Sequence, residues 1–543
     1  MVTNLLKNHI LSIIVSVLIS ISISIPNIVL LNKSGSEFLP FTSNSQLSYF
    51  EEETYIYSAQ IHQMLNGFFW GDPYVWEERN SPSLYLGEAG SLIPIFVLAK
   101  LTDSVNFAFI LADFIFPTLL FLLIYFSLIK LKFGRKISMI CALFVITAPF
   151  LSTLFPLIFN DQTRLFGSEN LPVFFSRTPH PQISSIYFFA SLFATIFIIK
   201  NPKIRLFYLW PIILGLSAYS TLFVTSTILL GIFLMTPIIL KVVPLKKVAV
   251  SFAIFFILIL PQMLNFLELQ KVVDQVDLLK RTTFEVDLLF PAQIRYIFIA
   301  FIYLIIKRDE LSKTIFAFVF AAALLIDIHQ LIIGRNVEAD HWISRALGPT
   351  STLTLILILQ KVFQTIKLFQ SKVIAAGLIT GLLLILFSTQ FFWINQNINK
   401  FDSLGSEQQL FSEIVQSTQK DDVIGSLDYS LNKHLTGMTG RRVYLPPGDR
   451  TIVDSSEQFN RLCYLYHLID PDKTSEVQRS ILNYAFGFEV WEAQNVDSLI
   501  AKMNDCRLSK IDSLNFKLDY LVIYDKDLGQ FRLEKKNENK NAL

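Results

Sequence analysis

The chain has 543 residues, of which 52% are hydrophobic and only 17% are charged, and its formal net charge is +2. Soluble proteins carry about 25% charged residues, so this composition excludes an ordinary soluble protein and favours an α-helical polytopic membrane protein. A net charge close to zero indicates no partner, and we expect no nucleic-acid partner.

Long apolar segments recur along the first 395 residues, and each is about long enough to cross a bilayer as a helix. The first is too long for a usual signal peptide and has no clear cleavage site before Asn32, so we expect a retained helix. Residues 88–101 are too short to span and are expected to form an interfacial helix. About eleven transmembrane helices are predicted, at residues 8–31, 105–129, 137–157, 182–199, 206–222, 223–240, 248–267, 289–306, 314–333, 345–360 and 373–395.

Basic residues gather in every second loop between these segments. Cytoplasmic loops of membrane proteins are enriched in lysine and arginine, so the pattern predicts an N-in, C-out topology. The chemistry is therefore expected on the extracytoplasmic side, and we expect the membrane to be a prokaryotic plasma membrane. The inner loops hold no glycine-rich phosphate cradle, so direct use of a cytoplasmic nucleotide is not expected. The basic residues are Lys130, Lys132, Arg135, Lys136, Lys200, Lys203, Arg205, Lys241, Lys246, Lys247, Lys307, Arg308, Lys313, Lys361, Lys367 and Lys372.

The domain organisation follows from a change in composition near residue 396. We expect residues 1–395 to form the membrane domain, with a long first outer loop at 32–104. Residues 396–533 alternate short strand patterns with helical patterns, which predicts a small extracytoplasmic α/β domain with a mainly parallel sheet. Residues 534–543 are expected to be a disordered tail. Strands are predicted at 423–427, 442–445 and 520–524, and helices at 405–419, 455–469, 474–486 and 496–505.

Three cysteines exclude a disulfide framework and show no metal-binding spacing. Cys463 and Cys506 could pair if their region is exported, but two unpaired thiols is the favoured reading.

Three consecutive carboxylates, Glu51, Glu52 and Glu53, directly precede aromatic residues in the first outer loop. Adjacent carboxylates repel one another, which raises the pKa of at least one unless a cation or metal lies between them. Such a group suits a base that deprotonates an acceptor, and it equally suits oxygen ligands for Mg²⁺ or Mn²⁺. The alternative is a solvated helix start, where acidic residues are common.

The run at residues 52–57, followed by Gly67 and residues 72–74, resembles the first outer loop of the GT-C class of integral-membrane glycosyltransferases. The layout is also similar to that of the oligosaccharyltransferases and mannosyltransferases of this class. The resemblance implies a sugar donor on a polyprenyl phosphate or diphosphate, and an acidic base or metal ligand just after the first helix. The family often has Asp where this chain has only Glu, so the choice among the glutamates and the use of a metal stay open. Glu52 and Glu53 fit the family pattern best.

Further candidates lie in the second outer loop. Asp161 would complete a metal or acceptor site with the glutamates, unless it only forms a surface ion pair with Arg164. Arg177 and His180 flank a proline-rich entry to a membrane helix, where lipid phosphates lie, so they are predicted to bind phosphate. The alternative is a helix-entry turn that requires only its prolines.

His341 and Arg345 lie four residues apart at a predicted helix start and so share one face. Together with Arg335 they would bind the carrier phosphate, whose charge grows in the transition state. Glu338 or Asp340 would orient His341. A snorkelling interfacial arginine is the alternative.

Within the predicted spans, Arg295 is a candidate second phosphate contact, whereas Asp113 is expected to be structural. Asp449, Arg441 and Arg442 could touch an acceptor, although residues 439–444 read first as a turn into a strand.

Together with these features, the resemblance implies a glycosyltransferase that moves a sugar, with inversion, from a polyprenyl-phosphate carrier to a glycan, lipid or protein acceptor. Two rivals are a transporter or flippase for lipid-linked saccharides and an O-antigen-type polymerase. The first predicts polar residues lining a path through the spans, and the second predicts a late arginine-rich outer loop. Neither pattern is evident in the sequence.

Overall fold

The computed structural model describes residues 2–34, 51–147, 178–202, 206–288, 290–365, 371–397, 405–470, 476–487, 496–508, 516–525 and 530–536. Some residues are described by their backbone alone, and their side chains lie outside this description: residues 2–8, 34, 51–55, 290–292, 340, 363–365, 393, 396–397, 405–408, 507–508 and 525.

A helix occupies each of the eleven segments predicted to span, although residues 148–157 of the third segment lie outside the described residues. Seven described helices, α1, α4, α8, α10, α11, α14 and α17, are long and apolar enough to cross a membrane. The chain is therefore a polytopic helical membrane protein, while the number eleven and the orientation remain predictions. The helices are α1 (Val2–Ser34), α4 (Val105–Lys130), α5 (Arg135–Ile146), α8 (Gln182–Lys200), α9 (Leu206–Ser217), α10 (Leu222–Val242), α11 (Leu245–Val272), α13 (Phe290–Lys307), α14 (Glu310–Ile333), α16 (Gly348–Thr365) and α17 (Lys372–Asn397).

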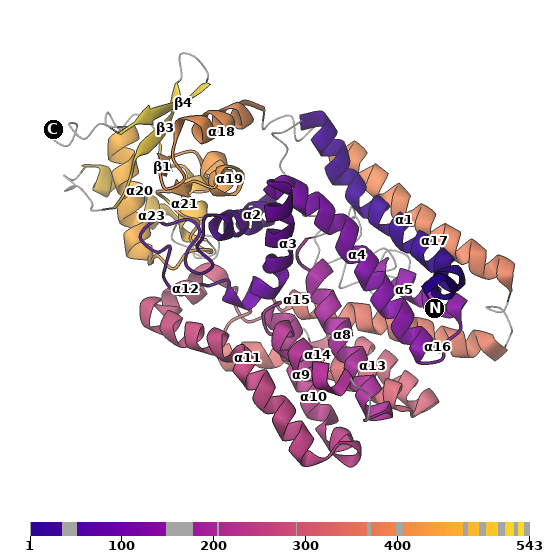
Figure 1. Ribbon diagram of the computed structural model, residues 1–543. Helices are drawn as coiled ribbons and strands as arrows, with labels where there is room; N and C mark the ends of the chain where they lie inside the picture. The colour runs from indigo at the N-terminus through magenta and orange to yellow at the C-terminus, as the bar shows by residue number, and fades with distance from the viewer. Residues whose placement is uncertain are drawn as a thin grey trace.

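Helix α4 is central to the membrane part, since it contacts α1, α3, α5 and α8, and α17 returns alongside α1 (Figure 1). Small and hydroxyl side chains allow close packing there. The Ser20 and Thr118 hydroxyls lie 2.6 Å apart between α1 and α4, a polar contact common between membrane helices. Other helices turn large apolar side chains outward, such as Phe233 and Ile257, both 70% exposed. A bilayer would cover these side chains.

Two shorter helices of the first outer loop connect the two parts of the molecule. They are α2 (Glu51–Leu65) and α3 (Ala89–Thr102), and the second confirms the short helix expected at residues 88–101. A 3-10 turn, η2 (Leu86–Glu88), leads into α3. Helix α2 packs against α19 (Tyr429–Thr439) of the C-terminal part and against α3 (Figure 1). The apolar residues of α2 thus belong to a core that both parts share.

The C-terminal part contains a four-stranded sheet in the order β2-β1-β3-β4. Strand β1 (Val423–Ser426) pairs in parallel with β2 (Arg442–Val443) and β3 (Tyr520–Asp525), as predicted. The antiparallel β4 (Gln530–Lys535) was not predicted, and it includes Glu534 and Lys535, which the sequence pattern assigns to the tail. The helices are α18 (Gly405–Ser417), α19, α20 (Ser455–Ile469), α21 (Arg479–Phe486) and α23 (Val496–Leu508), of which α19 was not predicted.

Cys463 and Cys506 form a disulfide that joins α20 to α23, with their Cα atoms 6.3 Å apart. The favoured reading of two unpaired thiols is therefore wrong, because folding brings cysteines 43 residues apart within bridging distance. Cys141 is free and buried in the membrane part.

A set of buried hydrogen bonds, here called the domain clamp, fastens the first outer loop to the C-terminal part. It consists of Gln63, Asp72, Arg442 and Thr451. The Asp72 carboxylate accepts hydrogen bonds from Thr451 Oγ1 at 2.5 Å and from the Ile452 backbone nitrogen at 3.2 Å. The Arg442 guanidinium donates to Gln63 Oε1 at 2.6 Å and to the Asp72 carbonyl at 2.8 Å.

Candidate functional site

Seven polar side chains from distant parts of the chain gather where the first outer loop, the membrane helices and the C-terminal part meet. We call this group the outer cluster. Its members are Tyr57, Glu88, His180, Glu338, His341, Arg345 and Arg450. Glu88, Arg345, Arg450 and Glu338 all lie close enough to Tyr57 to affect the ionisation of its hydroxyl. Burial raises the pKa of Tyr57, and the Glu88 charge raises it further, so the phenol stays protonated and able to donate.

Arg345 is the most unusual member of the cluster. It lies in a π-helical turn, η4 (Ile343–Leu347), and such turns inside helices occur frequently at functional sites. Its side chain is only 3% exposed, and its guanidinium carbon lies 5.0 Å from the centre of the Phe223 ring. Within the described residues, no carboxylate is at ion-pair distance and no acceptor takes a hydrogen bond from it. A buried cation without such partners is suited to bind an anion.

Glu338 and His341 form a pair beside Arg345. Glu338 Oε2 lies 2.7 Å from His341 Nδ1, and the His341 ring packs edge-on against Phe223 with centroids 4.8 Å apart. Burial alone would raise the pKa of Glu338, but His341, Arg450 and Arg345 lower it well below its ordinary value. His341 and Arg345 both contact Phe223, so the sequence prediction that they share one side is confirmed. Of the two acids expected to orient His341, Glu338 contacts it.

The loop that carries this pair is fixed by local hydrogen bonds. Asn336 and Phe284, which lies in the loop at 268–288, exchange two backbone hydrogen bonds of 3.1 and 2.9 Å. The His329 ring accepts from the Val337 backbone nitrogen at 3.2 Å, and the Trp342 indole donates to Ser226 at 3.1 Å. These contacts hold the start of the helix that leads into Arg345.

His180 and Glu88 face one another across two loops. His180 is fully buried, its Nε2 lies 3.7 Å from Glu88 Oε2, and its ring packs edge-on against Tyr57. Burial alone would raise the pKa of Glu88, but His180, Arg345 and Arg450 lower it overall. Glu88 is therefore ionised near neutral pH. The start of the adjacent helix α3 is fixed because Gly90 donates to the Tyr219 carbonyl at 2.6 Å.

Asp113 holds the turn that carries His180. Its carboxylate accepts hydrogen bonds from Asn27 Nδ2 at 2.6 Å, from Gln182 Nε2 at 2.8 Å and from the Thr178 hydroxyl. Asp113 is 1% exposed, so its partners and its burial support the structural role expected from sequence.

The C-terminal part contributes Arg450 to the cluster. The Arg450 Nε lies 3.2 Å from Asp449, and its carbonyl accepts from the Tyr85 hydroxyl at 2.8 Å. The neighbouring Gly448 carbonyl accepts from Arg281 of α12 (Gln275–Thr282) at 2.7 Å, so α12 helps to hold this segment. Burial alone would lower the pKa of Arg450, but Asp449, Tyr85 and Glu338 raise it, so the guanidinium stays charged.

Several predicted site residues cannot be placed in this geometry. The side chains of Glu51, Glu52 and Glu53 lie outside the described residues, as do Asp161 and Arg177. The proposed Mg²⁺ or Mn²⁺ site at Glu51, Glu53 and Asp161 therefore stays a prediction. In the described part of the chain, no group of three or more His, Cys, Asp or Glu side chains is arranged to hold a metal ion.

Arg295, Arg441 and Arg442 occupy different surroundings from Arg345. Arg295 is half-buried on α13, with its guanidinium 5.6 Å from the Tyr296 ring. Arg441 donates to the Val415 and Thr418 carbonyls at 3.0 and 2.9 Å, and Arg442 belongs to the domain clamp. The prediction that residues 439–444 form a turn into a strand is thus confirmed. Gly440 ends α19 with φ of 68°, and Arg442 lies in β2.

Sequence reasoning missed Glu88, Arg450 and the role of Tyr57 as a cluster member. Glu88 lies at the start of a helix that was noted only for its length, and Arg450 stands next to Asp449, which was considered. The local signal for Glu88 was its position as an acidic residue at the start of the expected interfacial helix in the first outer loop. Arg450 has no such signal, because only tertiary contacts bring it to the membrane part.

No family model and no curated protein matches the sequence. Among solved structures, the chain is similar to the crystal structure of the Archaeoglobus fulgidus oligosaccharyltransferase in its apo form. The similarity extends over 95% of this chain and 69% of that chain, with 11% sequence identity and a TM-score of 0.44. A likeness this low carries no conclusion about the reaction that the chain performs.

Proposed function

We propose that the protein is a membrane glycosyltransferase that transfers a sugar from a polyprenyl-phosphate carrier to an acceptor on the extracytoplasmic face. The observation that carries this proposal is Arg345. This residue is 3% exposed, and its guanidinium lacks a carboxylate partner within the described residues and lies among Tyr57, Glu88, His341 and Arg450. A phosphate there would receive charge-assisted hydrogen bonds from a cation already positioned for it.

The extracytoplasmic location is supported by two independent features. The Cys463–Cys506 disulfide is typical of an oxidising compartment. The basic loops favour a cytoplasmic N-terminus, which would leave the C-terminal part on the other side of the membrane. The outer cluster draws Arg450 from the same part of the chain that carries the disulfide. It would therefore face the same compartment.

In the proposed reaction, the bond between the anomeric carbon and the carrier phosphate oxygen breaks, and a bond from the acceptor atom to that carbon forms. The acceptor proton passes to a carboxylate, for which Glu52 and Glu53 are the candidates. Glu53 lies four residues before Tyr57, about one helical turn earlier in α2. The carrier phosphate leaves with an added negative charge, which Arg345 and the Tyr57 hydroxyl would stabilise.

A divalent metal ion is part of the proposal only if Glu51, Glu53 and Asp161 act as its ligands. If bound there, Mg²⁺ or Mn²⁺ would neutralise charge on the carrier phosphate. A transfer assay with and without a chelator tests this directly.

The test of the proposed function is transfer of label from a radiolabelled polyprenyl-phosphate sugar in membrane vesicles that contain their native acceptors. We expect Arg345→Ala to reduce transfer by about 10²–10³-fold, a loss typical of removing a group that stabilises transition-state charge. The double variant Glu52→Gln/Glu53→Gln should be inactive. Arg532→Ala, at a residue 57% exposed on β4, is the matched arginine control and should keep full transfer.

Two outcomes count against the proposal. Full transfer by Arg345→Ala would remove the assigned phosphate contact, and full transfer by Glu52→Gln, Glu53→Gln and their double variant would remove the base. A flippase would instead move the labelled lipid across the bilayer without passing its label to any acceptor.

A further inference from the structure

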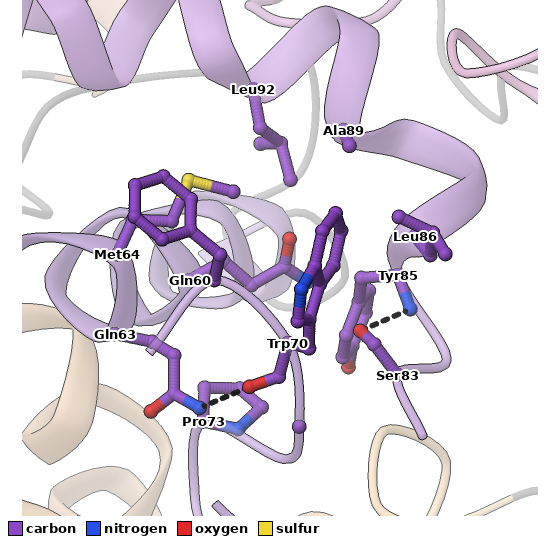
Figure 2. A pocket seen from close by; sticks show the side chains of 12 residues that line it. Gln60, Gln63, Met64, Trp70, Pro73, Ser83, Tyr85, Leu86, Ala89 and Leu92 are labelled. Carbon is purple, nitrogen blue, oxygen red and sulfur yellow. Dashed lines mark hydrogen bonds between the residues drawn. The ribbon is translucent and has the colours of Figure 1, made fainter. Parts of the chain in front are cut away.

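A cavity that we call the basic pocket lies in the membrane part, away from the outer cluster. Its volume is about 300 Å³, at the lower end of the range of about 300–1,000 Å³ that is usual for ligand pockets. The pocket of the first outer loop that Figure 2 shows is much smaller, about 20 Å³, with room for about one or two waters. The lining residues of the basic pocket used below are Lys132, Phe133, Lys200, Lys307, Asp309 and Gln360.

The basic pocket lies where several helices end on one face of the membrane part. Lys200 and Lys307 are the last residues of α8 and α13, and Lys132 follows the end of α4. Helix α8 starts at Gln182, two residues after His180 of the outer cluster, and its 19 residues rise by about 28 Å. Because the hydrocarbon core of a bilayer is about 30 Å thick, a membrane around α8 would place the pocket among the lipid headgroups of the opposite face.

Three lysines and one aspartate give the lining of the pocket a net positive charge. Lys132 and Lys200 are exposed, and Lys307 is half-buried. Within the described residues, none of the three ammonium groups lies at ion-pair distance from a carboxylate. Asp309 is the N-cap of α14, and its Oδ1 already accepts a hydrogen bond from the Ser312 backbone nitrogen at 2.9 Å. The lysines are therefore available to an anion.

Gln360 distinguishes the pocket from an ordinary basic loop. It is 4% exposed, and it forms no hydrogen bond within the described residues. Its Oε1 is enclosed by protein, which leaves the Nε2 donor as the amide atom for a ligand, and a phosphate oxygen would accept from it. Lysines that only follow the enrichment of basic residues in cytoplasmic loops need no buried amide beside them.

The backbone around the pocket is held in place before any ligand binds. Lys132 has φ of 69°, in the left-handed region that favours glycine, where it ends α4. The next backbone nitrogen, of Phe133, donates to the Leu128 carbonyl at 3.0 Å. At the start of α5 the Ser138 hydroxyl donates to the Gly134 carbonyl at 3.1 Å. A loop fixed by these bonds presents the Lys132 side chain at a set position.

Apolar side chains lie next to the cations, which favours a lipid over a soluble phosphate. Phe133 is part of the pocket lining. Ile305 and Ile306 directly precede Lys307 on α13 and are 50% and 41% exposed. Val362, close to the end of the neighbouring helix α16, is 49% exposed. Acyl chains attached to a headgroup in the pocket would cover this apolar surface, whereas a soluble phosphate would leave it uncovered.

We propose that the basic pocket binds the headgroup of an anionic phospholipid, with its phosphate among Lys132, Lys200 and Lys307. The phosphate oxygens would accept charge-assisted hydrogen bonds from the ammonium groups and one hydrogen bond from Gln360. Basic pockets between membrane helices are suited to such headgroups. The bound lipid would connect the ends of α4, α8 and α13. The inference does not depend on sugar transfer, because the pocket and the outer cluster lie at opposite ends of α8.

The test is native mass spectrometry of the full chain, freed of lipid, in micelles of an uncharged detergent. The probe is dioleoyl phosphatidylglycerol. Phosphatidylethanolamine with the same acyl chains is the zwitterionic comparison, since its ammonium group could pair with Asp309. We expect phosphatidylglycerol to bind at least about tenfold more tightly, because three lysines favour a net negative headgroup. Glycerol 1-phosphate at the same concentration should not displace it, because it lacks acyl chains.

The pocket variants should weaken binding of phosphatidylglycerol in proportion to what they remove. The triple variant Lys132→Gln/Lys200→Gln/Lys307→Gln should bind at least about tenfold more weakly, as expected when charged hydrogen bonds are lost. Gln360→Leu should bind about threefold to tenfold more weakly, the effect of one neutral hydrogen bond. Each variant is also measured together with Arg345→Ala, so that a phosphate held at the outer cluster is not counted.

Two matched controls should keep the affinity of the wild type. Lys241→Gln/Lys246→Gln/Lys247→Gln removes the same charge from three exposed lysines at the end of α10 and the start of α11, on the same predicted face. Gln390→Leu replaces a fully buried carboxamide of α17 that has no partner within the described residues. Unchanged unfolding temperatures of the pocket variants would show that lost binding is not lost folding.

The inference is overturned if the pocket triple variant keeps the affinity of the wild type, or if the control triple variant loses as much as the pocket triple variant. Equal binding of phosphatidylethanolamine would show that the pocket does not select an anionic headgroup. Displacement by glycerol 1-phosphate at the same concentration would assign the pocket to a soluble phosphate ester and overturn the lipid.

Discussion

The domain clamp and the outer cluster both bury arginine near carboxylate, yet they use their hydrogen-bonding groups differently. In the clamp, the Asp72 carboxylate accepts hydrogen bonds from Tyr74, Val75, Thr451 and Ile452. The Arg442 guanidinium donates to the Asp72 and Val75 carbonyls and to Gln63 Oε1. In the cluster, Arg345 has no such acceptor within the described residues. A structural arginine is therefore distinguished from one available to a ligand by whether its N–H donors are already hydrogen-bonded, and not by residue type or burial.

The largest expected effect is on folding, at the clamp. Asp72→Ala leaves a buried hydroxyl and three backbone N–H groups without their acceptor, so we expect a loss of about 3 kcal/mol or more in the free energy of unfolding. Asp72→Asn should lose less, since a carboxamide oxygen still accepts. Thermal unfolding of the purified protein measures both. A wild-type unfolding temperature in Asp72→Ala would show that the clamp is not structural.

The opposite behaviour is expected at the cluster. Arg345→Ala should keep the wild-type unfolding temperature within about 2 °C while its sugar transfer falls by about 10²–10³-fold. Arg442→Ala should show the reverse order of effects, with a strongly lowered unfolding temperature. Parallel unfolding and transfer measurements on the two variants make the comparison. If both variants lose stability equally, the contrast between clamp and cluster fails.

A smaller, pH-dependent effect is expected where α2 packs on α19. Burial, together with the Arg441 charge, lowers the pKa of His62 from 6.5 to about 4. The unfolded chain therefore binds a proton that the folded chain does not, so His62 reduces stability as the pH falls from about 6.5 toward 4. Unfolding temperatures at pH 7 and pH 5 should differ less in His62→Gln than in the wild type. An equal difference in the two proteins would contradict this role.

The smallest expected effect is at Glu338. Its pKa is lowered in the folded protein, so its contribution to stability is present above its ordinary pKa of 4.5 and is lost as the pH falls below that value. The difference in unfolding temperature between wild type and Glu338→Gln should thus shrink below pH 4.5. Because Glu338 is 34% exposed, we expect a modest difference even at pH 7. A difference that grows with acidification would reverse the assigned sign.

Much of the fold could be predicted because its signals are local. Long apolar segments predicted eleven spanning helices, and the structure has a helix at each of these positions. Short apolar segments predicted three of the strands of the C-terminal sheet. Helix α19 and strand β4 were missed because their sequences are polar and their formation depends on packing. The Cys463–Cys506 disulfide was also missed, since pairing depends on a distance that only the fold sets.

The site was predictable only in part, for the same reason. The spacing of His341 and Arg345 and the prolines around His180 are local features, and the fold brings these residues to one cluster. Glu88 and Arg450 join them through tertiary contacts that span hundreds of residues, such as the bond from Tyr85 to the Arg450 carbonyl. No pattern within one segment carries that information.

The central claim is that the outer cluster binds the phosphate of a polyprenyl carrier through Arg345. The most direct measurement is the affinity of the purified protein in lipid nanodiscs for a polyprenyl monophosphate without a sugar. Arg345→Ala should weaken this binding at least about tenfold, the cost of a charged hydrogen bond, while Arg532→Ala leaves it unchanged. Wild-type affinity in Arg345→Ala and in the double variant Arg345→Ala/Arg450→Ala would contradict the claim.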